Sequence, residues 1–121
     1  MQNEAQVERC QESVRDALMR RACARRTISY GELAQRVGLP PQRYVLMRQL
    51  PRLVETVNAD EAADGWPLLG ALVVRVADGL PGAGFFRHAR ALGRLAPDAS
   101  RAAERSFHER ELQRIYSAWA E

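Results

Sequence analysis

Apolar residues near the N-terminus recur mostly three or four positions apart, the spacing of a helix that buries one face. Over residues 7–24 these positions are Val7, Cys10, Val14, Ala17, Leu18 and Ala22. Acidic residues lie early in this stretch and arginines lie late, an order that complements the helix dipole. We therefore expect an amphipathic helix, followed by a short β-prone stretch over residues 27–29. The arginines near the end of the helix either stabilise its C-terminus through the helix dipole or bind phosphates: Arg20, Arg21, Arg25 and Arg26.

The next pattern predicts two helices joined by a tight turn. Ser29 stands three positions before Glu32, the spacing of a capping box that begins a helix. A Gly-Leu-Pro-Pro turn (residues 38–41) is expected to end this helix and to lead into a second one over residues 42–57. Pro51 interrupts the second pattern, so we expect a kink or a restart there. The pair is a helix-turn-helix candidate.

A β-prone run follows an acidic segment. Residues 58–65 are polar and are expected to form a surface loop or a short helix, with solvated acids at Asp60, Glu61 and Asp64. Residues 67–76 then predict a strand, residues 77–79 a turn, and residues 80–86 a glycine-rich return. This strand, turn and return resemble a wing. Aromatic side chains within the return are expected to close the core: Phe85 and Phe86.

The C-terminal part predicts helices. Residues 87–95 fit a short helix, and Asp98 or Ser100 is placed to cap a longer one that runs to Trp119. Its apolar stripe is Ala103, Phe107, Leu112, Ile115 and Trp119. Its charged face, expected to be solvated, is Glu104, Arg105, Glu109, Arg110, Glu111 and Arg114. We therefore expect one domain over residues 1–121, mostly α with a small β wing: a winged helix-turn-helix core over 10–86, flanked by an N-terminal helix and an additional C-terminal helix over 98–120.

Composition narrows the function classes. No apolar run approaches the roughly 18 residues of a membrane span, and the charged first 26 residues do not form a signal peptide, so we expect a cytoplasmic protein without membrane contact. Cys10 and Cys23 are too far apart on one helix to pair and lack metal-site spacing, as do the single His88 and His108, which we expect at the surface. No metal or other cofactor is expected.

The basic residues give weak support to nucleic-acid binding. All 18 of them are arginine, whose guanidinium fork matches phosphates and base edges. An arginine-rich genome would impose the same bias, and the net charge is only +3. The charge therefore permits a nucleic-acid partner without requiring one.

One string in the helix-turn-helix candidate carries a family resemblance. Residues 27–34 read Thr-Ile-Ser-Tyr-Gly-Glu-Leu-Ala. This resembles the "TxSYGELA" segment that begins the helix-turn-helix of alkylguanine-DNA alkyltransferases and alkyltransferase-like proteins. Upstream, residues 14–18 resemble the "VWEAL" helix of that family. The Tyr-Gly-Glu-Leu-Ala string is the specific part of the match.

The resemblance continues downstream. Gly38-Leu-Pro40 matches the family's "GxP" turn, and Leu50 matches its "RAVGxAL" recognition helix. After an insertion, Val73-Val74 and Asp78-Gly79 resemble its "RVVxxDG" strand and wing. The similarity covers about residues 10–86.

The resemblance implies minor-groove binding by the second helix and a flipped base. Tyr30 matches the tyrosine that presses on the phosphate of the flipped nucleotide. Tyr44 stands where the family has the arginine that fills the gap left by the base, and Arg43 is one position earlier, about 100° around a helix. The tyrosine is a substitution that could still wedge into a base stack.

The family's reactive cysteine is missing. Its "PCHRV" segment supplies an activated thiol. Anchored on Pro67, the alignment places Leu68 at the cysteine position; anchored on Val73-Val74, it places Gly70 there. Neither residue is a nucleophile, and the two cysteines belong to the N-terminal helix. Alkyl transfer is therefore excluded, and we expect a protein that is not an enzyme.

Two functions remain open. The first is a non-catalytic module that binds double-stranded DNA with little sequence specificity, through Tyr30, Arg43, Tyr44, Arg48, Arg52 and Arg75. The stripe of Tyr44, Arg48 and Arg52, spaced i, i+4 and i+8, is its main signal, although a solvated arginine face would have the same pattern.

The second function is a protein-interaction or inhibitory module that keeps the winged-helix scaffold without DNA. The acidic segment after Val54 would lie beside the DNA-facing helix and oppose phosphate binding. The C-terminal helix could pair with another chain or with a second copy, with Trp66 and Trp119 as anchors. An acidic loop across the arginine face would favour this function, and a continuous positive surface would favour DNA.

Overall fold

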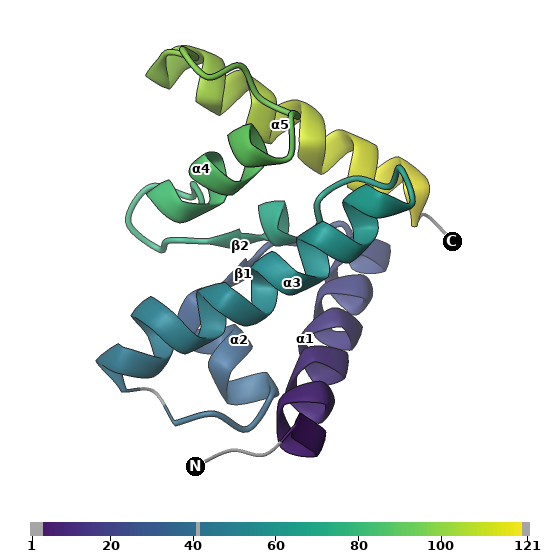
Figure 1. The fold of residues 1–121 in the computed structure, drawn as a ribbon, viewed down its shortest axis with the longest axis vertical. Coiled ribbons are helices and arrows are strands. Elements are labelled where there is room, and N and C mark those ends of the chain that lie inside the picture. The colour runs from purple at the N-terminus through teal and green to yellow at the C-terminus, as the bar shows by residue number, and fades with distance from the viewer. Residues whose placement is uncertain (1–3, 41, 120–121) are drawn as a thin grey trace.

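The computed structural model describes residues 4–40 and 42–119 and shows a mostly helical domain with a very small sheet (Figure 1). Its α-helices are α1 (Glu4–Ala24), α2 (Tyr30–Arg36), α3 (Leu50–Ala63), α4 (Ala83–Ala91) and α5 (Arg101–Ala118). A π-helical turn, η1 (Val45–Gln49), leads into α3, and a 3-10 turn, η2 (Leu69–Leu72), precedes the second strand. None of the described helices is both long and apolar enough to cross a membrane.

The sheet consists of two strands of two residues each. β1 (Ile28–Ser29) pairs in parallel with β2 (Val73–Val74). Figure 1 shows α1, α2 and α3 on one side of this pair and α4 and α5 on the other. The sheet thus joins the two halves of the domain.

The predicted capping box is present at the start of α2. Ser29 Oγ accepts a hydrogen bond from the Glu32 backbone N–H at 3.1 Å, and Glu32 Oε1 accepts one from the Ser29 N–H at 3.4 Å. Gly38 follows the helix with a φ of +76°, in the left-handed region expected at a helix end. The Pro40-Pro41 corner of the predicted turn lies partly outside the described residues, because Pro41 is not among them.

The kink or restart expected at Pro51 takes the form of a π-helical turn, after which α3 begins at Leu50 with Pro51 in its first turn. Helical residues run from Arg43 to Ala63, with the π-helical turn immediately before the proline. The Leu50 N–H donates to the Val45 carbonyl, five residues back. A wider turn accommodates proline because its ring would clash with the carbonyl four residues back and it has no N–H to donate.

Of the surface loop or short helix expected over residues 58–65, the structure shows a helix, because α3 extends to Ala63, but the expected exposure is wrong at two positions. Asn58 and Glu61 are buried on α3. Glu61 forms an ion pair with Arg15 of α1 at 2.6 Å. Polar residue types predicted exposure, but each of these side chains finds a partner in a different segment.

The predicted wing is not formed. The run over residues 67–76 contains a 3-10 turn and only two strand residues, and the glycine-rich return is helical from Ala83. Leu68, Leu69 and Leu72 are all fully buried at the centre of the fold, where η2 contacts α1, α3 and α5. A short apolar run has the same composition whether it is a strand or another buried segment, so its periodicity could not decide between them.

The C-terminal helix belongs to the core. Ser100 caps α5 by accepting a hydrogen bond from the Ala103 N–H at 3.1 Å. Phe107 and Ile115 are buried as expected, and Phe85 and Phe86 close the same core. Of the helix predicted over 98–120, the structure shows residues 101–118 as α5, and residue 120 lies outside the described residues.

Two side chains of α5 correct the expectation of solvated polar residues. His108 is 5% exposed and Glu111 is 1% exposed. Glu111 Oε2 accepts a hydrogen bond from the Leu68 N–H at 3.0 Å, and its other oxygen accepts one from Arg114 at 2.8 Å. The charged face predicted for α5 is therefore narrower than the sequence pattern indicated.

Candidate nucleic-acid interface

The continuous helical stretch over residues 43–63, which includes η1 and α3, is called the long helix below, and its N-terminal half presents arginine beside exposed apolar groups. Arg43, Arg48 and Arg52 are exposed. Tyr44 and Met47 lie between them with 59% and 65% of their surfaces in contact with solvent. The predicted stripe of tyrosine and two arginines therefore lies on one solvent-facing surface. We call it the α3 face because it leads into the first turn of α3, although only Arg52 lies within α3 itself. Its residues are Arg43, Tyr44, Met47, Arg48 and Arg52.

Packing on the opposite side fixes the orientation of the α3 face. Val45 and Leu50 are buried, and α2 packs against η1. With these two side chains turned inward, Met47 and Arg48 between them project outward. Met47 was not predicted from the sequence. The sequence could have indicated this exposed position, because Met47 is an apolar residue outside the core stripe of its helix.

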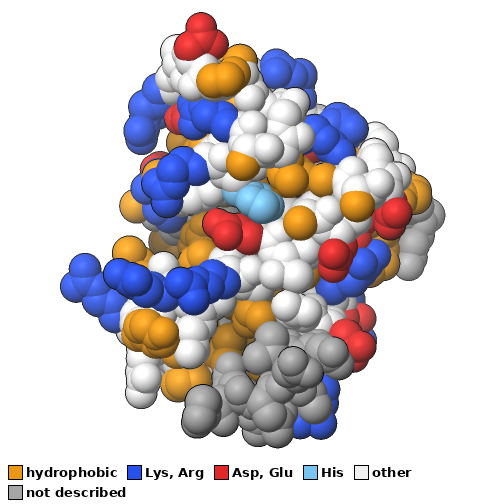
Figure 2. All heavy atoms as spheres, viewed as in Figure 1, with side chains coloured by type: hydrophobic (Ala, Val, Ile, Leu, Met, Phe, Trp, Pro, Cys, Tyr) orange, Lys and Arg blue, Asp and Glu red, His pale blue; other side chains and the backbone are white. Residues whose placement is uncertain are grey.

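The arginines of the α3 face are electrostatically unneutralised. Among the described residues, no carboxylate lies within 4.0 Å of the guanidinium groups of Arg43, Arg48 or Arg52. Figure 2 shows blue side chains gathered along the N-terminal half of the long helix. Unpaired guanidinium groups on an exposed helix remain free to bind phosphate.

Two acidic residues of α3, Asp60 and Glu61, lie at its other end, whereas Glu55 is half-buried three positions beyond Arg52. Asp60 is 12 positions beyond Arg48, which corresponds to about 18 Å along a helix. Glu61 is buried against Arg15, and burial raises the pKa of its carboxyl although the arginine opposes that shift. No acidic loop crosses the α3 face within residues 42–63, because this stretch is helical from Arg43.

Tyr30 lies at the start of α2 and is half-buried. Its hydroxyl oxygen accepts a hydrogen bond from the Gly82 N–H at 3.1 Å. Burial raises the pKa of the phenol, so Tyr30 keeps its proton. The O–H therefore remains able to donate to an acceptor such as a phosphate oxygen.

Arg75 lies apart from the α3 face, directly after β2. It donates two hydrogen bonds to Asp78, at 2.6 and 3.3 Å. The Leu80 N–H also donates to Asp78 at 3.0 Å, and these contacts hold the pKa of the carboxyl below its usual value. The structure thus gives Arg75 a turn-stabilising contact where the sequence predicted a wing.

Both positions that the family resemblance assigns to the cysteine are buried. Leu68 has no exposed surface, and Gly70 is buried. The Gly70 N–H donates to Asn58 Oδ1 at 2.7 Å, and a Cβ at Gly70 would lie 2.6 Å from Asn58 Nδ2 and 2.7 Å from Val54 Cγ1. Such distances are shorter than real contacts allow. A side chain at Gly70 therefore requires its neighbours to move.

Of the two histidines expected at the surface, only His108 is buried. The buried His108 Nε2 donates to the Ala71 carbonyl at 2.8 Å, and burial lowers the pKa of its imidazole. His88 is half-buried on α4. In the part of the chain that the structure describes, no three His, Cys, Asp or Glu side chains are grouped as metal ligands. The two cysteines on α1 are half-buried free thiols.

Comparison of the chain with protein-family models, curated proteins and solved structures found no match.

Proposed function

We propose that this protein is a non-catalytic module that binds double-stranded DNA through the α3 face, with little sequence specificity. The observation that carries the proposal is the juxtaposition of unpaired arginines and exposed apolar side chains on one helix. Arg48 and Arg52 would contact phosphates on the DNA backbone. Tyr44 and Met47 would enter the groove and press against base steps, as apolar wedges of minor-groove proteins do.

Low sequence specificity follows from the groove that the wedges would enter. The minor groove presents nearly the same acceptors for A·T and T·A pairs, so it distinguishes little beyond A·T from G·C. Tyr30, with a hydroxyl proton still to donate, would add a phosphate contact near the start of α2. The family resemblance of residues 27–34 supports the same use of this helix pair.

The test is binding of a fluorescent duplex, measured by anisotropy over a range of salt concentrations. The variant pair Arg48→Gln and Arg52→Gln removes two cations from the α3 face. The matched control pair, Arg9→Gln and Arg110→Gln, removes two exposed arginines from α1 and α5. We expect the wild type to bind with an affinity that falls steeply with salt. The slope should decrease by about 0.9 for each phosphate that the α3-face variant no longer neutralises.

Retention of the wild-type slope by the α3-face variant, with its melting temperature unchanged, would exclude this face as the binding surface. A second arm compares intact duplex with duplex that contains an alkylated guanine. Preference for the modified duplex would indicate base flipping in addition to backbone binding.

One observation favours the alternative, a protein-interaction module. Trp66 is 46% exposed and packs on Trp119 of the C-terminal end with ring centroids 5.4 Å apart. Exposed tryptophan is enriched at the energetic centres of protein interfaces. Absence of DNA binding at low salt, where phosphate attraction is strongest, would favour this function over the first.

A further inference from the structure

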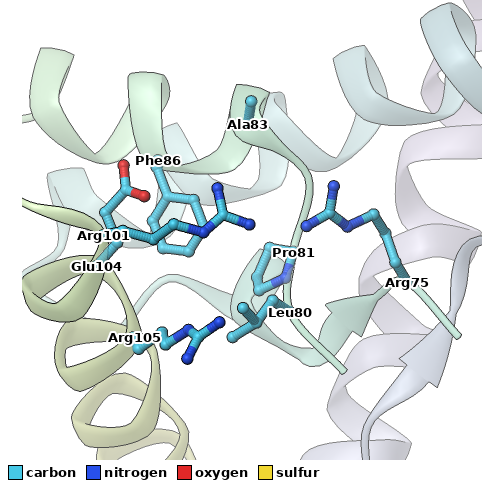
Figure 3. Close-up of a pocket in the computed structure, with 8 residues that line it drawn as sticks. All are labelled: Arg75, Leu80, Pro81, Ala83, Phe86, Arg101, Glu104 and Arg105. Carbon is cyan, nitrogen blue, oxygen red and sulfur yellow. The ribbon is translucent and has the colours of Figure 1, made fainter. Parts of the chain in front are cut away.

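A second arginine cluster lines a small pocket between the loop after β2, the start of α4 and the first turn of α5. The pocket encloses about 80 Å³. Leu80, Pro81, Ala83 and Phe86 provide its apolar lining, and Arg75, Arg101, Glu104 and Arg105 provide its charged lining. Figure 3 shows the guanidinium groups of the three arginines turned toward the space beside Pro81 from different sides.

Two of these arginines have no carboxylate partner among the described residues. Asp78 neutralises Arg75 at 2.6 Å, and Glu104 is bound by Arg90 of α4 at 2.8 Å. Across residues 4–40 and 42–119, no hydrogen bond or ion pair forms between the guanidinium group of Arg101 or of Arg105 and a protein group. These two exposed like charges are one helical turn apart and repel each other weakly, so an anion bound between them would relieve that repulsion.

The backbone adds to the positive field of the pocket. α4 begins at Ala83, and its N-cap residue Gly82 supplies no side-chain cap. The free N–H groups of a helix start carry partial positive charge. An anion in the pocket would therefore meet two unpaired guanidinium groups and the positive end of a nine-residue helix.

We propose that this pocket binds a backbone phosphate of the same DNA duplex that contacts the α3 face, an inference that rests on the proposed function. Its volume is well below the roughly 300 Å³ of the smallest typical small-molecule sites, so it suits a phosphate group rather than a nucleotide. Guanidinium forks bind phosphate with paired, charge-assisted hydrogen bonds.

The placement of the pocket favours DNA as the source of the phosphate. In Figure 1 the start of α5, the loop that leads to α4 and the N-terminal end of the long helix all lie along the left edge of the molecule. Figure 2 shows blue side chains repeated down this edge. One duplex lying along the edge would meet the α3 face and the pocket together. The C-terminal helix thereby lengthens the DNA-binding surface.

The test uses the full chain with Arg101→Gln and Arg105→Gln introduced together. Glutamine keeps a long helix-forming side chain while removing the charge. We expect the slope of log affinity against log salt to decrease by about 0.9 if the two arginines share one phosphate. The control pair Arg9→Gln and Arg110→Gln should keep the wild-type slope, and all variants should keep the wild-type melting temperature.

Failure of this inference is distinguishable from failure of the proposed function. An unchanged slope in the pocket variant, with a reduced slope in the α3-face variant, would overturn the pocket assignment alone. Absence of wild-type DNA binding would overturn both. Titration of inorganic phosphate and of an acidic peptide, followed by NMR of the arginine Nε–H groups, identifies other occupants. If phosphate or the acidic peptide saturates the arginine signals while the wild type binds no DNA, that compound and not the duplex would be the ligand of the pocket.

Discussion

His108 illustrates how a single residue depends on its surroundings. Its Nε2 donates to the Ala71 carbonyl inside the core, and the neutral imidazole satisfies that acceptor without a buried charge. Glu111, one turn further along α5, accepts from the Leu68 N–H. Both side chains bond to the backbone of the segment around η2, which holds the central turn against α5. They act as structural groups although their residue types are those of a catalytic site.

At the scale of a single residue, we predict that protonation of His108 at acidic pH destabilises the folded state. Burial depresses the pKa of the folded imidazole below its ordinary value of 6.5. The unfolded chain therefore binds the proton more readily, and the contribution of the neutral histidine is fully present above pH 6.5. It is lost as the pH falls through 6.5 toward the folded pKa. The free energy of unfolding, measured in urea from about pH 7.5 down to about pH 5, should decrease accordingly.

The His108→Gln variant isolates this contribution, because its amide can donate to the same carbonyl and does not titrate. Its unfolding free energy should vary less with pH than that of the wild type. Equal pH dependence in the two proteins would show that other groups cause the effect.

The elements differ in how far their local sequence specifies them. The capping box of α2 is local, since Ser29 and Glu32 satisfy each other's backbone groups within four residues. The start of α3 depends on more distant contacts, because Val45 and Leu50, at the two ends of the π-helical turn, are both buried in the fold. This turn also sets the direction in which the α3 face projects.

For α2 we predict that Ser29→Ala lowers the unfolding free energy by about 1 kcal/mol, since the Glu32 N–H loses its cap. Ser106→Ala, on the exposed surface within α5, is the matched control and should change stability by less than about 0.5 kcal/mol. Chemical denaturation measures both. Equal effects of the two substitutions would mean that the capping box does not stabilise the folded state.

Over the whole molecule, the two halves share one core around η2. α5 contributes Phe107 and Ile115 to that core, although its sequence lies outside the region that resembles the alkyltransferases. It also contributes Arg101 and Arg105 to the phosphate pocket proposed above. The helix that the sequence marked as an addition is therefore part of the folding unit.

We expect Ile115→Ala to lower the unfolding free energy by about 2–5 kcal/mol, because it leaves a cavity where the side chain is fully buried. Gln113→Ala, on an exposed position of the same helix, should have little effect. Urea unfolding followed by circular dichroism compares them. A change below about 1 kcal/mol for Ile115→Ala would show that α5 does not stabilise the rest of the domain.

Patterns within a few turns of the chain were sufficient for several predictions. Apolar spacing identified α1, the Ser29–Glu32 pair identified the start of α2, and Ser100 was one of two candidate caps for α5. The spacing of Tyr44, Arg48 and Arg52 also indicated an exposed stripe, which the structure shows on one surface. Such features arise from contacts between near neighbours in sequence, so one segment contains the information for them.

Other features depended on the packing of distant segments. The run over residues 67–76 forms a buried turn and a parallel strand because α1, α3 and α5 enclose it. The spacing of apolar residues within the run cannot predict that these distant helices surround it. Glu61, His108 and Glu111 are buried because each finds a partner far away in sequence. The pocket of Arg101 and Arg105 exists only where α5 meets the loop before α4. Burial and charge pairing across long separations are properties of the folded molecule, since residue type sets only what each group requires from its surroundings.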